Sequence, residues 1–155
     1  MNNPLWEFSL ELYACPGVAA ACMEAQDHCA ADVNLLLYAA WLARQGLALD
    51  QLQWRELAVS VTEWRQRVVQ PLRALRRDWR ALPAAAALRE EIRVLELAAE
   101  REQQAQIFAW HRRQAALPAE ADSLARALAQ LLALPSTLAD SDRRALVRRL
   151  HALLT

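Results

Sequence analysis

Glycine is almost absent from this chain, since only Gly17 and Gly46 occur among its 155 residues. Most of the remaining positions hold Leu, Ala, Arg, Glu or Gln, and all of these residue types favour helices. No run of alternating Val, Ile or Thr indicates a strand. The sequence therefore predicts an all-α fold, a compact bundle of about six to eight helices.

The most hydrophobic part of the chain is the segment from about residue 32 to residue 45. Its large apolar side chains would point in every direction from a helix, and they are Leu35, Leu36, Leu37, Tyr38 and Trp41. A helix that is apolar on all sides is a buried helix. We therefore expect a central helix here, capped by Asp32 and ended by Gly46. Asn34 would be buried near its start and must be hydrogen-bonded.

The breaks between helices are marked by proline. Asn3 and Pro4 fit the cap and first position of an N-terminal helix. Later breaks are expected at Pro16–Gly17, Pro83, Pro118 and Pro135. The segment after Pro118 is simpler and rich in Leu and Ala. We expect a helical core domain over residues 1–117 and a C-terminal helical hairpin over residues 118–155.

A helix with two different sides is predicted over residues 60–82, because Ser60 and Glu63 have capping-box spacing. One arc of this helix is apolar and is expected to pack on the core. It contains Trp64, Val68, Leu72, Leu75, Trp79 and Leu82. The adjacent arc is basic and is expected to face water or a partner; it contains Arg65, Arg73, Arg76, Arg77 and Arg80. Pro71 lies at the edge of the apolar arc and is expected to kink the helix.

Several classes of chemistry lack their usual residues. The chain has no lysine, so a P-loop lysine and a Schiff-base lysine are excluded. Glycine-rich phosphate loops and the G-x-S-x-G elbow are absent as well. Cys15, Cys22 and Cys29 lack C-x-x-C spacing and are expected to be small core residues. We therefore expect no cofactor, no metal and no assigned catalytic residue.

The N-terminal residues show neither the basic region nor the apolar core of a secretion signal. The longest apolar run, Leu35–Ala43, is much shorter than the ~20 residues needed to span a membrane. We therefore expect a cytoplasmic protein without a membrane segment.

The first candidate site is the cluster Asp27, His28, Asp32 and Asn34, at the end of one predicted helix and the start of the next. Its carboxylates could converge in a pocket as an acid/base pair or around a metal ion. Alternatively, Asp32 only caps its helix, Asn34 ties helices together, and Asp27 and His28 are partly solvated. The second interpretation is favoured.

The second candidate site is the arginine set Arg65, Arg73, Arg76, Arg77 and Arg80. It could bind an acidic protein surface or RNA phosphates, although the net charge of zero disfavours RNA. Alternatively, these arginines pair within the chain with Glu90, Glu91 or Glu96. A homodimer formed through residues 84–114 is a third hypothesis.

Parts of the sequence resemble a family of short proteobacterial proteins of unknown function. The resemblance rests on Asn3–Tyr13, on Pro16-Gly17-Val18 through Cys22 and Gln26-Asp27, and on Ala31-Asp-Val-Asn-Leu-Leu-Leu37. It continues through Trp64-Arg65 and Val69-x-Pro71-Leu72-Arg73. It implies an α-helical cytoplasmic bacterial protein and supplies no activity. The leading hypothesis is a non-enzymatic adaptor that presents the arginine set; the alternative is a small-molecule or metal-binding enzyme that uses Asp27, Asp32 and Asn34.

Overall fold

The computed structural model describes residues 2–133 and 136–155. Helices account for nearly all of its regular structure, so the all-α prediction is confirmed. The chain forms two compact units, one of residues 1–54 and 114–155 and the other of residues 55–113. The predicted division after residue 117 remains a prediction, and the break expected at Pro135 lies outside the described residues.

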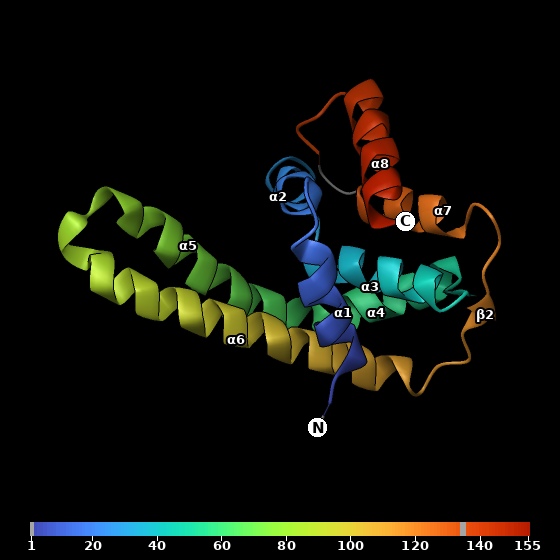
Figure 1. The fold of residues 1–155 in the computed structure, drawn as a ribbon, viewed down its shortest axis with the longest axis horizontal. Coiled ribbons are helices and arrows are strands. Elements are labelled where there is room, and N and C mark those ends of the chain that lie inside the picture. Colours follow the sequence, from blue (N-terminus) through green and yellow to red (C-terminus); the bar gives the residue numbers. More distant parts are fainter. Residues whose placement is uncertain (1, 134–135) are drawn as a thin grey trace. The chain divides into compact units, whose positions relative to one another are not determined.

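The first unit contains most of the short helices. They are α1 (Pro4–Tyr13), α2 (Val18–Cys29), α3 (Val33–Arg44), α7 (Ser123–Leu131) and α8 (Asp140–Leu154), with strands β1 (Leu47–Ala48) and β2 (Leu117–Pro118) (Figure 1). The two strands pair antiparallel, and Ala119 donates its backbone N–H to the carbonyl of Gly46 at 2.9 Å. Strands of two residues leave no periodic signal, which explains why the sequence did not predict them.

Helix α3 is the centre of this unit, as the sequence predicts. Every residue from Asn34 to Leu42 is buried, and α1, α2 and α7 all pack on this helix. The Tyr38 ring stacks on Trp41 at 6.1 Å and meets Trp54 edge-on at 5.7 Å. The prediction that this helix, apolar on all sides, is enclosed by its neighbours is therefore confirmed.

Helix α2 buries a side made of small residues, which are Val18, Ala21, Cys22, Ala25 and Cys29. Small side chains allow a close approach by another helix, and α8 packs here. Gly17 precedes α2 with φ of +85°, and a Cβ at this position would lie 3.3 Å from a methyl group of Leu153. Glycine at this position therefore allows the positive φ angle and leaves room for the Leu153 side chain.

The second unit is a helical hairpin. Helix α4 (Gln51–Trp64) continues without a break through a π-helical segment (Arg65–Val69) into α5 (Gln70–Asp78). Two 3-10 turns, Trp79–Ala81 and Pro83–Ala85, then reverse the chain into the long helix α6 (Ala86–His111). In Figure 1, α5 and α6 run side by side in opposite directions.

The predicted helix start at Ser60 is wrong. Ser60 lies inside α4 and donates its hydroxyl to the Leu57 carbonyl at 2.7 Å. The capping residues are found earlier, where Asp50 accepts from the Gln53 backbone at 2.7 Å and Gln53 accepts from the Asp50 backbone at 3.0 Å. This reciprocal pair satisfies free N–H groups at the true start of α4.

The π-helical segment replaces the kink expected at Pro71. The Gln70 N–H bonds to the Arg65 carbonyl, a span one residue longer than in an α-helix. Pro71 has no N–H to donate, and the wider turn lies directly before it. One extra residue rotates the following helix by about 100° relative to a continuous α-helix.

Candidate functional site

The four residues of the first predicted site, Asp27, His28, Asp32 and Asn34, do not act as one group. The Asp32 carboxylate caps α3 by accepting the Asn34 backbone N–H at 3.0 Å. The Asn34 side chain is buried, whereas Asp27 and His28 are exposed. Nδ1 of His28 lies 3.2 Å from the Thr137 hydroxyl, and its carbonyl accepts the Thr137 N–H at 2.7 Å. His28 therefore holds the segment before α8.

A metal site is not evident from the geometry. Within residues 2–133 and 136–155, no group of three His, Cys, Asp or Glu side chains lies close enough to hold a metal ion.

No helix within these same ranges is both long and apolar enough to cross a membrane.

An open cavity of about 450 Å³ lies between the start of α4 and α7, and the sequence analysis did not predict it. Asp50, Trp54, Glu120, Arg126 and Gln130 are among its lining residues. Arg126 bonds Glu120 at 3.1 Å, and the Gln130 amide donates to the Gln51 carbonyl at 3.3 Å. These contacts engage part of the polar groups of the wall.

Two arginines of the predicted set face α6 instead of solvent. Arg73 donates to Glu96 at 3.3 Å and to Glu100 at 2.8 Å, and Arg76 donates through two nitrogens to the same Glu96 carboxylate. The Glu96 side chain is only 8% exposed, and the side chains of Arg73 and Arg76 are 15% and 18% exposed. The hydrogen bond to Glu96 raises the pKa of Arg76.

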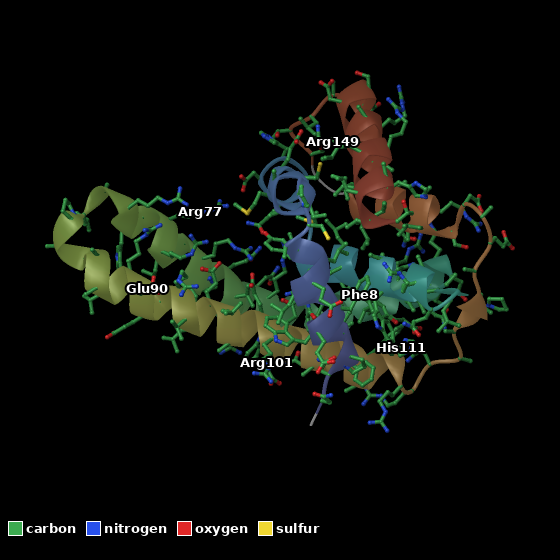
Figure 2. All side chains as sticks on the ribbon, viewed as in Figure 1. Phe8, Arg77, Glu90, Arg101, His111 and Arg149 are labelled. Atoms are coloured by element: carbon green, nitrogen blue, oxygen red, sulfur yellow. The ribbon has the colours of Figure 1, made fainter. Side chains whose placement is uncertain are left out.

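This ion network lies in the seam between α5 and α6. Arg89 adds to it by donating to the Arg76 carbonyl at 2.8 Å. Pairing with Glu96 was one of the alternatives drawn from the sequence, but Glu100 was not foreseen. Of the remaining members of the set, Arg65 and Arg77 are partly buried and Arg80 is exposed. Figure 2 shows Arg77 on α5 and Glu90 on α6, so both helices of the hairpin carry charge.

The expectation that the apolar arc packs on the core is wrong for its C-terminal part. Leu75 and Leu82 are 39% and 52% exposed, and on α6 Leu88 and Leu95 are 55% and 54% exposed. The π-helical segment explains the difference, because its extra residue turns Arg73 and Arg76 toward α6 and turns Leu75 outward.

Three of these leucines fall on one side of the hairpin by helical geometry. Leu88 and Leu95 are seven residues apart in α6, so they repeat on one side of that helix. Leu75 directly precedes Arg76, and Leu95 directly precedes Glu96. In two antiparallel right-handed helices, residues at these positions lie on the same side of the seam. Leu82 lies in the extended link between the two 3-10 turns and is not part of this set. Leu75, Leu88 and Leu95 are called the leucine face below.

The hairpin thus defines the class of molecule: an all-helical protein that exposes a leucine-rich surface on a two-helix hairpin. A family model described as protein of unknown function (DUF2390) matches residues 4–107, and the chain belongs to this family. No curated protein and no solved structure matches the chain.

Proposed function

We propose that this chain is a non-enzymatic interaction protein whose hairpin, residues 55–113, is the partner-binding element. The observation that carries the proposal is the leucine face. Exposed single leucines are ordinary on a protein surface, whereas several on one side of one element mark an interaction site. Most of the large exposed apolar side chains of the described residues lie on this hairpin, and the leucine face is part of this group.

The arginine set supports a different role from the one expected from the sequence. A guanidinium that already binds a carboxylate in a half-buried seam is poorly placed to bind a second anion. Arg73 and Arg76 are in this position, so we assign them to holding α5 against α6. Arg80 is exposed and is the member best placed to add a contact with an acidic group of a partner.

The alternative is an enzyme that uses Asp27, Asp32 and Asn34. It has weaker support, because Asp32 already accepts a backbone N–H as a helix cap and Asp27 is exposed. The bacterial, cytoplasmic setting implied by the sequence resemblance is part of our proposal. The three free cysteines, two of them buried, are compatible with a reducing compartment.

Site-specific crosslinking tests the proposed function. A photoreactive amino acid replaces Leu88 or Leu95 on the leucine face, or Leu97 on another side of α6 as the matched control. The proposal predicts a discrete adduct from the first two positions and none from Leu97. The crosslinked protein is then identified by mass spectrometry and mixed in pure form with wild type and with Leu95→Gln. Binding that is equally strong to both would contradict the proposal.

A further inference from the structure

We propose that the leucine face binds a basic amphipathic helix of a partner protein, with the partner's apolar side on the leucines and its Lys or Arg side chains against acidic residues at the rim. This inference rests on the proposed function and adds the chemistry of the partner to it.

The charges beside the leucine face are acidic. Glu91 lies three residues after Leu88 and four before Leu95, and this spacing places it on the same side of α6. Glu102 follows Leu95 by seven residues and continues this side, and Asp78 follows Leu75 by three residues on α5. All three carboxylates are exposed.

These acidic residues differ from most other carboxylates of the hairpin. Glu63, Glu90, Glu96 and Glu100 each bind an arginine of the same unit. Within the described part of the chain, no arginine or histidine forms an ion pair with Asp78, Glu91 or Glu102. The arginines Arg73, Arg76 and Arg89 lie in the seam, away from this rim.

The dimensions suit one further helix. Leu88 and Leu95 are separated by two helical turns, or about 10 Å, and Leu75 lies on the same face across the seam. A helix with apolar residues at i, i+3, i+4 and i+7 can lie along such a face and complete a three-helix arrangement. Its flanking basic residues would then meet Glu91 and Asp78.

Charge also decides between this partner and a second copy of the chain. Two leucine faces packed on each other would bring acidic rim against acidic rim, and like charges at an interface are unfavourable. A helix with the opposite charge at its edges removes this repulsion and gains attraction. The homodimer through residues 84–114 is therefore the less favoured occupant.

The test uses two synthetic helical peptides of about 18 residues that share one leucine stripe. One peptide carries Lys and Arg on its polar side, and the other carries Glu. Binding to the full chain is measured by fluorescence anisotropy at about 50 and 300 mM salt. We expect the basic peptide to bind about tenfold more tightly than the acidic one at low salt, with a smaller difference at high salt.

Variants locate the binding surface. Leu88→Gln and Leu95→Gln should each weaken the basic peptide about tenfold, and Leu97→Gln, on another side of α6, should leave binding within about twofold. Glu91→Lys should weaken the basic peptide and strengthen the acidic one. All substituted residues are exposed, so circular dichroism should show unchanged helicity.

The possible failures are distinguishable. Equal binding of both peptides, or preference for the acidic one, overturns the inference and leaves the leucine face as a docking surface. A wild-type dimer that Leu95→Gln dissociates also overturns it, because a second copy then occupies the face. No binding of either peptide by a monomeric chain overturns the inference alone. A crosslinking result in which only Leu97 reacts removes the proposed function as well.

Discussion

The indole Nε1 of Trp64 donates a hydrogen bond of 2.9 Å to the backbone carbonyl of Ala99. The two residues are 35 positions apart, and the bond joins the last turn of α4 to the middle of α6. Trp64 lies directly before the π-helical segment, so this bond holds the end of α4 against α6 at the place where the rotation of α5 begins. A tryptophan at this position therefore has a polar role in addition to packing.

Replacement of Trp64 by Phe is expected to lower the free energy of unfolding by about 1 kcal/mol beyond the loss of ring area, because the Ala99 carbonyl loses a donor. Equilibrium urea unfolding provides the measurement. Trp79→Phe is the matched control, since Trp79 is a half-buried tryptophan of the same hairpin that makes no such bond among the described contacts. Equal losses in the two variants would show that the hydrogen bond contributes nothing.

Removal of the Glu96 carboxylate should be the most damaging single change in the hairpin. Glu96→Ala leaves Arg73 and Arg76 in the seam without their shared acceptor, and breaking such a buried pair costs on the order of 3 kcal/mol. Glu90→Ala, which removes an exposed partner of Arg93, should stay close to wild type. Thermal and urea unfolding of the two variants should differ clearly; similar midpoints would mean that the seam does not depend on its ions.

The start of α3 depends on its cap. Asp32→Ala should destabilise the protein by about 1 kcal/mol, whereas Asp32→Asn, which retains a side-chain acceptor, should be nearly neutral. If Asp32 instead served as a buried acid or metal ligand, Asn would lose that chemistry as fully as Ala. Equal effects of the two substitutions on stability would therefore argue against the capping role.

The three cysteines should react very differently with alkylating reagents. Cys22 is fully buried, and burial raises the pKa of its thiol to about 12; Cys29 is also buried, and Cys15 is exposed. At about pH 8, iodoacetamide should modify Cys15 in the native protein and all three residues in urea. Peptide mapping by mass spectrometry distinguishes them. Rapid native modification of Cys22 would contradict the packing of α2 against α8.

Stability should fall in mildly acidic solution partly because of His111. Burial lowers the pKa of this imidazole below its ordinary value of 6.5, and its ring stacks on Phe108 at 6.2 Å. The unfolded chain then binds a proton more readily than the folded chain does. The stabilisation is complete above about pH 6.5 and is lost as the pH falls through the lowered pKa.

A comparison with His111→Gln isolates this contribution. Urea midpoints measured between about pH 5 and pH 7.5 should fall less steeply with acid in the variant than in wild type. Identical slopes would show that His111 contributes nothing to the acid dependence.

The buried helix and its cap were predictable because they depend on local residues. Asp32 precedes a segment whose apolar side chains point everywhere, and no distant contact is needed to infer burial. The alignment of the leucine face was not predictable, because a helical projection assumes a constant 100° from Trp64 to Leu82. Pro71 indicated an irregularity, but it could not reveal that the turn before it holds an extra residue.

The π-helical segment Arg65–Val69 holds one residue more than an α-helix of the same length, so it sets the orientation of the helix that follows it. Deletion of a single residue there would let an ordinary α-helix run through the stretch and would leave Arg76 opposite Glu96. If the same residues were wound as an ordinary α-helix without a deletion, α5 would turn by about 100°, Leu75 would enter the seam and Arg76 would face water. The stretch can therefore lose one codon without exchanging the apolar and basic sides of α5.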